Sequence, residues 1–322
     1  MKGILISLLA LALLLAPAGV PAADYPTREI EYVVGFPPGS SVDHVGRLLS
    51  KFAEKHVGKP VVVVNKPGGG GSRGFSSIAA AKPDGYTIGL ISQSAVIQPY
   101  LMKGVTFNYK KDFRLIGEVA YTAEGIYVKK GGPFDRPLPE IIKMAKEKPN
   151  TIKLAVGGMW TGSDVARLML EDQTGAKFIR IINPGGGQDM VPGILGGHMD
   201  IAIGEGAQWA PLYTAGKFNI LAVSIDKRDP RFPNIPTLKE LGYDISFSVT
   251  FGSAAPAGTP DSVINFLSEA FRKAVAEEGY REGSDKAFNT PSWKSPSDYL
   301  KQYEKLDTTF QALIKKYDLK PE

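Results

Sequence analysis

The stretch Glu29–Ser92, EIEYVVGFPPGSSVDHVGRLLSKFAEKHVGKPVVVVNKPGGGGSRGFSSIAAAKPDGYTIGLIS, decides the fold. It contains three short apolar runs, EIEYVVG, PVVVVN and YTIGLIS, separated by Val42–Val57 and Phe75–Ala81. In the first of these separating segments, apolar side chains recur every three or four residues, which is typical of a helix with one buried face. The order strand, helix, strand, helix, strand predicts a doubly wound parallel sheet.

A second unit of the same kind begins near residue 138. Its segments are, in order, helix 138–148, strand KLAV, helix 163–174, strand FIRII, a glycine-rich loop, helix 190–195, and strands MDIAIG and NILAVS. A second alternation of this length predicts a second α/β unit with its own sheet.

Two extended segments flank the second unit. Residues 113–130 and 245–255 show no helical period, so we expect two strands to connect two lobes. Helices are expected over 262–278 and from SPSDYL to about Tyr317, and they return to the first lobe because no third sheet is present to receive them. The predicted division is residues 24–124 for lobe 1, with 249–322 returning to it, and 125–248 for lobe 2.

The N-terminal residues have the pattern of a secretory signal. Lys2 precedes an apolar run from Ile4 to Leu15, and small residues follow up to Ala23. The run is too short to cross a membrane. We therefore predict a signal peptide over residues 1–23, cleaved near Ala22 or Ala23, and a periplasmic protein.

The composition is that of an ordinary globular protein, with 322 residues of which 43% are hydrophobic and 22% charged. The chain has no cysteine, which excludes disulfides, thiolate metal sites and a cysteine nucleophile. The net charge of +5 is spread over single lysines and arginines without a basic stripe. We therefore predict no nucleic-acid partner.

Gly69, Gly71 and Gly74 have the G-x-G-x-x-G spacing of dinucleotide-binding loops. In those loops the first glycine follows the strand directly, and an acidic residue at the end of the next strand binds the ribose. Here residues 65–68 separate the strand from the glycines, and Asp84 precedes the next strand. No Lys-Ser or Lys-Thr follows the glycines either, as a phosphate-binding loop requires. We predict no nucleotide or other cofactor, and a loop in which backbone approaches a neighbour closely.

Three further loops follow predicted strands and open predicted helices: residues 35–43, 157–164 and 183–189. Ser40–Asp43 and Thr161–Asp164 share the Ser/Thr-x-x-Asp spacing with Ser295–Asp298 at the last helix, so helix capping alone can explain these acids. The loops nevertheless lie at carboxyl ends of parallel strands, the edge where open α/β sheets bind ligands. Helix N-termini at that edge favour a small anion, especially a carboxylate.

Six stretches in chain order are GFPPGSSVDHVGR, VVVVNKPGGGGSRG, KPDGYTIG, Gly-Gly-x-x-Asp at 196–200, RFPNIPTLKELGY and FGSAAPAGTP. Together they resemble the periplasmic solute receptors of tripartite tricarboxylate transporters, the Bug family, over nearly the whole chain after the signal. The resemblance implies a two-lobed periplasmic binding protein of the Venus-flytrap kind, with two crossover strands between α/β lobes. It also implies that the protein binds a small carboxylated molecule in its cleft and delivers it to a membrane permease.

The resemblance further implies which residues hold the ligand. In that family a first-lobe loop and a second-lobe glycine loop pinch one carboxylate, and here these are Phe36–Asp43 and Pro184–Asp189. Serine and threonine hydroxyls line the cleft, and Trp160 either contacts a ring or spacer of the ligand or packs on the neighbouring lobe. Apart from the resemblance, Asp200 is a candidate for orienting the second-lobe loop. The candidate ligand-binding residues are Phe36, Pro38, Gly39, Ser40, Ser41, Asp43, Ser92, Ser94, Trp160, Thr161, Ser163, Pro184, Gly185, Gly186, Gly187, Asp189 and Asp200.

Two positions depart from the family's pattern. Its tyrosine-lysine-glycine before the second-lobe glycines is here Asn183-Pro184-Gly185, and the histidine after its Gly-Ser helix start is absent from GSDVA. Both positions bear on the far end of the ligand, so the sequence leaves open which carboxylate binds and whether it is aliphatic or aromatic.

A secreted hydrolase is the alternative from another class, with Asp43 and His44, or Asp200 and Glu205, as its paired groups. The three histidines are scattered, and neither H-E-x-x-H nor G-x-S-x-G occurs. A sensory receptor that presents its ligand-bound form to a membrane signalling partner would have the same fold. The prediction is a monomeric binding protein without enzymatic activity or a metal, whose partners are a small carboxylate and a permease.

Overall fold

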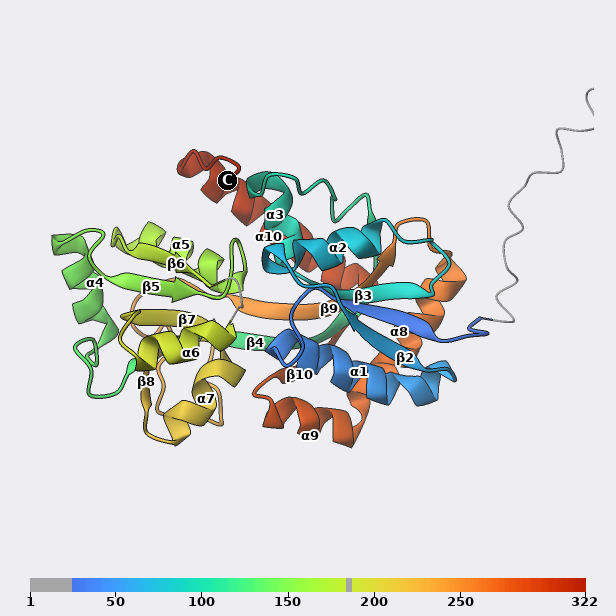
Figure 1. The fold of residues 1–322 in the computed structure, drawn as a ribbon, viewed down its shortest axis with the longest axis horizontal. Coiled ribbons are helices and arrows are strands. Elements are labelled where there is room, and N and C mark those ends of the chain that lie inside the picture. The colour runs from blue at the N-terminus through green and yellow to red at the C-terminus, as the bar shows by residue number, and fades with distance from the viewer. Residues whose placement is uncertain (1–24, 184–186) are drawn as a thin grey trace, which may run out of the picture.

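The structure is a computed structural model that describes residues 25–183 and 187–322. The predicted signal peptide, residues 1–23, and the candidate residues Pro184, Gly185 and Gly186 lie outside this part. Figure 1 shows a mixed α/β fold with one lobe at each end of the long axis. The two-lobed α/β fold predicted from the sequence is confirmed.

The first lobe contains a parallel sheet in the order β2-β1-β3, continued by an antiparallel strand beside β3. Helices follow each parallel strand, as the alternating sequence predicts. The elements are β1 (Ile30–Val34), α1 (Ser41–Val57), β2 (Val61–Asn65), the 3-10 helix η2 (Gly69–Gly71), α2 (Ser72–Ala79), β3 (Thr87–Ser92), α3 (Ser94–Leu101) and β9 (Ser248–Pro256).

Helix α1 shows how the sequence produces these elements. Its residues Val42, Val45, Leu49 and Ala53 recur every three or four positions and are all buried. The helix ends at Gly58, which has a φ of 77° and donates its N–H to the Glu54 carbonyl. A glycine adopts that left-handed conformation without steric strain, so the helix stops there.

The second lobe has its own parallel strands in the order β7-β5-β6. Its elements are α4 (Leu138–Glu147), β5 (Lys153–Val156), α5 (Gly162–Thr174), β6 (Ile179–Ile182), α6 (Gly187–Leu195), β7 (Ile201–Glu205), α7 (Gly206–Thr214) and β8 (Phe218–Val223). Helix α7 is absent from the sequence prediction, which has no helix between MDIAIG and NILAVS.

Strand β4 (Phe113–Lys129) connects the two lobes (Figure 1). Residues 113–123 pair with β9 in the first lobe, and residues 124–129 pair with β7 and β8 in the second. The predicted lobe boundary after residue 124 lies beside this change of partners, and the one after residue 248 lies where β9 begins. We propose the same boundaries for the lobes.

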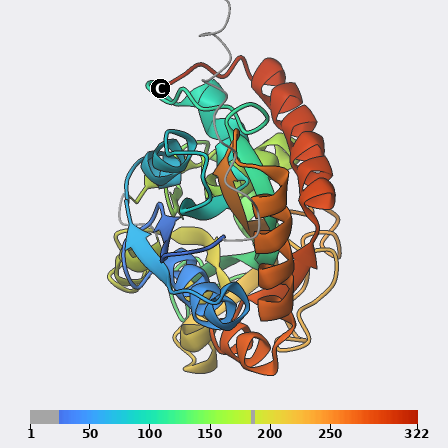
Figure 2. The same cartoon turned by 90° about the vertical axis from the view of Figure 1, so that its right-hand side faces the viewer.

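The C-terminal elements return to the first lobe, where α8 packs on α1 and on β4, and α10 packs on β4 and α3. Figure 2 shows α10 as a long helix along one side of the molecule. Strand β10 pairs antiparallel with β4 through Thr290 and Tyr121, an addition to the sheet that the sequence analysis does not predict. The elements are α8 (Asp261–Ala276), α9 (Glu278–Lys286), β10 (Thr290–Lys294) and α10 (Pro296–Lys316).

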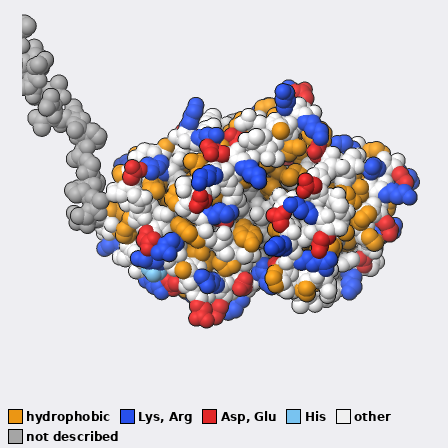
Figure 3. Space-filling model, turned by 180° about the vertical axis from the view of Figure 1, so that it is seen from behind, with side chains coloured by type: hydrophobic (Ala, Val, Ile, Leu, Met, Phe, Trp, Pro, Cys, Tyr) orange, Lys and Arg blue, Asp and Glu red, His pale blue; other side chains and the backbone are white. Residues whose placement is uncertain are grey.

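The surface carries charges of both signs. On the face drawn in Figure 3, described Lys and Arg side chains are interspersed with Asp and Glu side chains rather than gathered in a basic stripe. No helix in the described part of the chain combines the length and apolar character that a membrane crossing requires.

Candidate functional site

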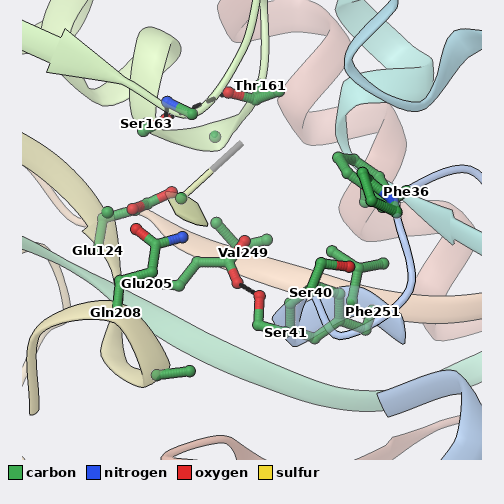
Figure 4. Close-up of a pocket in the computed structure, with 18 of the residues that line it drawn as sticks. Phe36, Ser40, Ser41, Glu124, Thr161, Ser163, Glu205, Gln208, Val249 and Phe251 are labelled. Carbon is green, nitrogen blue, oxygen red and sulfur yellow. Dashed lines mark hydrogen bonds between the residues drawn. The ribbon is translucent and has the colours of Figure 1, made fainter. Parts of the chain in front are cut away.

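A cavity of about 370 Å³ lies between the lobes. It is bounded by the loop after β1, the end of β3, the loop after β5 and the end of β7. Figure 4 shows Phe36, Ser40 and Ser41 of the first lobe and Thr161 and Ser163 of the second around the same space. The carboxyl ends of parallel strands from both lobes therefore meet at one cavity, as the loop positions in the sequence predict.

The loop before α1 is held by reciprocal hydrogen bonds. The Ser40 hydroxyl accepts from the Asp43 amide at 3.2 Å, and the Asp43 carboxylate accepts from the Gly39 amide at 2.9 Å. Gly39 adopts a φ of 80°, which a residue with a side chain takes only with strain. This local geometry turns the chain sharply from β1 into the helix.

Asp43 belongs to this framework and does not line the cavity. Its carboxylate accepts from Arg47 Nε at 2.9 Å and from Asn65 Nδ2 at 2.7 Å. Burial opposes ionisation of Asp43, but the hydrogen bonds from Arg47, Asn65 and the Gly39 amide together lower its pKa. The neighbouring His44 is exposed, so the structure does not bring this pair together in the cavity, as the hydrolase alternative requires.

The loop before α5 repeats the arrangement around Asp164. Its carboxylate is fully buried and accepts from the Trp160 amide at 3.0 Å and from Arg167 Nε at 2.9 Å. Arg180 donates to both oxygens of the same carboxylate. The Ser163 hydroxyl accepts from the Gly157 amide at 2.9 Å, so the loop is fixed at both ends.

These two helix starts present free backbone donors to the cavity. The first intrahelical bond of α1 runs from the His44 amide to the Ser40 carbonyl, and that of α5 from the Val165 amide to the Thr161 carbonyl. Amides earlier in each first turn therefore have no acceptor within their own helix. Those of Ser41, Val42, Gly162 and Ser163 belong to residues that line the cavity. Two helix N-termini from opposite lobes thus begin at one cavity, an arrangement that favours an anion.

Ser92 and Ser94 add hydroxyl groups to the same wall. Both residues line the cavity and are buried, with 4% and 3% exposure. Within the described chain, neither hydroxyl makes a side-chain hydrogen bond, whereas the side chain of Gln93 between them accepts from the Thr250 amide at 2.9 Å. The two serines are therefore available to a ligand, while Gln93 fixes the strand end that carries them.

The glycine loop lies behind this wall and does not line the cavity. A methyl group at Gly70 would lie 2.8 Å from the Met159 carbonyl of the opposite lobe, and one at Gly71 would lie 2.8 Å from the Phe36 ring. Gln98 Nε2 donates to the Gly70 carbonyl at 3.0 Å. The glycines therefore permit close packing of the backbone against the loops that form the cavity.

Gly71→Ala is expected to lower the free energy of unfolding by about 2 kcal/mol. The residue has a φ of 100°, and its new methyl would contact the rings of Phe36 and Phe75 at 2.8 and 2.9 Å. Strain and overpacking therefore add. Urea denaturation measures the loss. Gly58→Ala is the control, because that site also has positive φ but no atom within 4 Å, and about 1 kcal/mol is expected there. Equal losses at both sites would contradict the crowding argument.

Two acidic residues complete the cavity. Glu124 on β4 and Glu205 at the end of β7 both line it, and Ser41 donates to Glu205 across the lobes (Figure 4). Burial and the Glu205 carboxylate raise the pKa of Glu124 well above its ordinary value. Burial raises the pKa of Glu205 to about 6, an increase that the Ser41 hydrogen bond limits. From the sequence, Glu124 is not predicted to line the site, and Glu205 is predicted only as a partner for Asp200.

Four described candidates lie outside the cavity lining, in addition to Asp43. Pro38 does not line the cavity, whereas its neighbour Pro37 does. Trp160 is buried against Arg180, whose guanidinium carbon lies 4.7 Å from the ring centroid; it is packed rather than open to the cavity, but this contact is with its own lobe and not with the neighbouring one. Asp189 is exposed on α6.

Asp200 lies at the opposite end of β7 from the cavity. Its carboxylate accepts from the Lys153 amide at 2.7 Å and joins the starts of β5 and β7. Since Glu205 ends β7 at the cavity, the two acids are separated by the length of the strand. The structure brings together the other described candidates, Phe36, Gly39, Ser40, Ser41, Ser92, Ser94, Thr161, Ser163 and Gly187.

The fold and the interlobe cavity define a two-lobed binding protein of the periplasmic class. The family model described as "Tripartite tricarboxylate transporter family receptor" matches residues 45–319. The chain therefore belongs to this family, to which the Bug proteins also belong, and its members are periplasmic solute-binding receptors.

Individual relatives agree with this assignment. "UPF0065 protein in gbd 5'region" of Cupriavidus necator is 32% identical over 98% of this chain and 96% of its own length. "Protein BugT" of Bordetella pertussis is 30% identical over 85% of this chain and 86% of its own. The solved structure of the periplasmic binding protein BugD superposes with a TM-score of 0.84 at 27% identity, covering 92% of this chain and 100% of that one.

Proposed function

We propose that this receptor captures a small organic carboxylate in the interlobe cavity and delivers it to a membrane permease of the tripartite tricarboxylate type. The observation that carries the proposal is the pair of helix starts, α1 and α5, whose first-turn residues from opposite lobes line one cavity. A carboxylate between them would accept hydrogen bonds from both lobes and hold the lobes together.

The proposal also covers export, the oligomeric state and the residues of the ligand site. Residues 1–23 direct export and are removed near Ala22 or Ala23, and the receptor acts as a monomer. Phe36, Gly39, Ser40, Ser41, Ser92, Ser94, Thr161, Ser163 and Gly187 form the described part of the ligand site. No group of three or more potential metal-ligating side chains occurs in the described residues, and catalysis is not part of the proposal.

Thermal and chemical unfolding with a panel of carboxylates tests the function. The protein is stripped of ligand by unfolding and refolding, and NAD and sugars serve as controls. A carboxylate present at a hundred times its dissociation constant is expected to raise the free energy of unfolding by about 2.7 kcal/mol. Stabilisation by a sugar or by NAD, with none by any carboxylate, would overturn the proposal.

Ser94→Ala is expected to weaken carboxylate binding about tenfold, because a hydrogen bond to a charged group contributes roughly 1.5–3 kcal/mol. Stability should change little, since the Ser94 hydroxyl makes no side-chain hydrogen bond in the described chain. Titration calorimetry measures the affinity. Ser50→Ala, at a buried serine of α1 outside the cavity, is the matched control and should bind as wild type. Unchanged affinity in Ser94→Ala would remove this hydroxyl from the site.

A further inference from the structure

We propose that Glu124 and Glu205 form a subsite for a protonated amine, so that the ligand is a small amino carboxylate. The inference rests on the proposed function, because the starts of α1 and α5 would hold the carboxylate of the same molecule. It adds a second charged group to the ligand and assigns that group to named side chains.

The two glutamates lie directly opposite one another. Glu124 of β4 and Glu205 of β7 are paired residues in the antiparallel register, which places their side chains on one face with Cβ atoms about 5 Å apart. They are also the only charged side chains among the described residues that line the cavity. Two like charges in that position destabilise the protein unless a cation lies between them.

One carboxylate oxygen of Glu124 accepts no hydrogen bond in the described chain. The residue is 2% exposed, and its Oε2 has no hydrogen-bond partner in the described chain. Glu118, on the same strand, shows how this fold otherwise treats a buried glutamate: its oxygens accept from Ser292 at 2.7 Å and from Lys294 at 2.9 Å. A buried carboxylate oxygen left unpaired is strongly unfavourable. A donor from the ligand would satisfy it.

Gln208 supplies a further acceptor beside the acids. Its Oε1 is buried without a partner in the described chain, and Gln208 lines the cavity near Glu124 and Glu205 (Figure 4). The two unsatisfied atoms of described cavity-lining residues here, Glu124 Oε2 and Gln208 Oε1, are acceptors, and an ammonium group has three N–H donors and no acceptor. Gln93 Nε2, from a residue that does not line the cavity, is a buried donor near Glu124 without a partner in the described chain. A second carboxylate on the ligand would instead bring a third negative charge to this wall.

An organic cation fits this wall better than a metal ion. Calcium takes six to eight oxygen ligands, whereas no group of three potential metal-ligating side chains occurs in the described chain. The rest of the wall near α7 is apolar, with Val191, Pro211 and Leu212. Because Ser41 both begins α1 and donates to Glu205, the ammonium and carboxylate of the ligand would lie only a few bonds apart.

The protonation of the two acids is consistent with a missing cation. The pKa values of both are raised, that of Glu205 to about 6. An ammonium group between them would favour the ionised forms, so binding would release protons. A ligand that offers only carboxylates would have the opposite effect and would be bound together with protons.

Titration calorimetry with matched ligand pairs tests the subsite. The full chain is expressed, purified from the periplasm and refolded without ligand. The probes are L-glutamate and glutarate, L-aspartate and succinate, and L-leucine and 4-methylpentanoate, which differ within each pair by the amine. At least one amino acid is expected to bind about tenfold or more tightly than its partner lacking the amine. Titration in buffers of different ionisation enthalpy at pH 6 should show proton release.

Substitutions assign the preference to the glutamates. Glu124→Gln and Glu205→Gln keep the shape and remove the charge, and each should reduce the preference for the amine about tenfold. Glu118→Gln makes the same change on β4 outside the cavity and should keep the preference. Proton release by wild type provides a readout that does not depend on the variants folding.

The outcomes separate this inference from the function on which it rests. Carboxylates that bind equally well with and without the amine, with no effect of either glutamine substitution, would overturn the amine subsite and leave the receptor function intact. Binding by none of a wide panel of carboxylates would overturn both. Binding of an amine without a carboxylate, such as 4-methylpentylamine, that depends on Glu124 would support the subsite and contradict the carboxylate site.

Discussion

Replacing Asp164 with alanine is expected to lower the free energy of unfolding by about 3–5 kcal/mol, the largest effect of any single substitution discussed here. The fully buried carboxylate accepts from the Trp160 amide, from Arg167 and from Arg180. Arg167 is itself buried, with 8% of its side chain exposed. Arg167 would keep Glu171 and Arg180 would keep Glu322 as partners, but the carboxylate that joins both arginines to the Trp160 amide would be lost, and breaking a buried ionic network is strongly destabilising. Urea or guanidinium denaturation measures the change.

The last helix offers a matched control. Asp298 occupies the same position relative to Ser295 as Asp164 does to Thr161, and Ser295 accepts from its amide. Its side chain is 57% exposed, however, and among the described residues it pairs only with Ser295 and Lys301. Asp298→Ala is expected to change stability by at most about 1 kcal/mol. The two sites share the Ser/Thr-x-x-Asp spacing, although the Thr161 side chain makes no capping hydrogen bond within the described chain. The comparison therefore separates an exposed acid in the first turn from one in a buried network, which only Asp164 has.

The Asp164 variant also bears on function, because its loop carries residues of the cavity. Where Asp164→Ala remains folded, it should bind carboxylates more weakly than wild type, since Thr161, Gly162 and Ser163 would no longer be fixed. A loss of stability below about 1 kcal/mol, no greater than for Asp298→Ala, would show that packing rather than this network holds the loop.

Much of the fold could be predicted because its signals are local. Helix α1 places Val42, Val45, Leu49 and Ala53 on one face, and that spacing is visible in the sequence without any knowledge of the partner surface. The sequence does not predict helix α7, because its local helical signal is weak. Its sequence GAQWAPLYT includes Pro211 and shows only a weak helical stripe. Strand β10 contains Pro291 and forms at the edge of the sheet, where pairing with β4 decides its conformation.

The candidate site could be predicted only in part. The order of elements along the sequence places its loops, whereas pairing between distant strands places its two glutamates. Ser40 and Ser41 follow a strand and open a helix, so their place at the cavity could be predicted from the order of elements. Glu124 lies in a long extended segment, and its place opposite Glu205 depends on pairing between strands far apart in the chain. A charged residue within an otherwise apolar strand was the available signal, and Glu118 on the same strand shows why that signal alone is ambiguous.

At Asp43 the structure shows the predicted capping motif and also contacts that the sequence does not reveal. The capping pattern in the sequence is present, since Ser40 accepts from the Asp43 amide. The sequence does not show that Asn65, at the end of β2, approaches the same carboxylate within 2.7 Å. That contact, together with Arg47 and Gly39, occupies the carboxylate from within the protein. The acid therefore holds the loop before α1 in its conformation.

The unliganded protein is expected to become more stable as the pH falls from about 7.5 to about 5. Glu124 and Glu205 have raised pKa values when folded, that of Glu205 about 6 against an ordinary value of 4.5. The folded protein therefore holds more protons than the unfolded chain in this range, and its stability falls as pH rises. The contribution of Glu205 is fully present below about pH 4.5 and is lost as pH rises through about 6, and that of Glu124 is lost as pH rises through its own raised pKa. Glu205 alone accounts for up to about 2 kcal/mol, and Glu124 adds to it.

Glu205→Gln and Glu124→Gln should each flatten this pH dependence and raise stability at pH 7.5, because a neutral amide removes the repulsion between the paired side chains. Denaturation of wild type and both variants at pH 5, 6.5 and 7.5 measures the difference. The other titratable groups are present in all three proteins, so their contributions cancel in the comparison. The carboxylates whose pKa values are lowered, including Asp43, act at a lower pH.

Addition of a bound amino carboxylate should abolish the same pH dependence in wild type, since an ammonium group between the glutamates would supply the charge that protons supply in its absence. A ligand without an amine should leave wild type most stable at acidic pH. Wild-type stability that is constant or increases between pH 5 and 7.5, with no difference between wild type and the glutamine variants, would show that the two acids do not repel one another in the cavity. The inference that the ligand carries a cationic group would then lose its electrostatic basis.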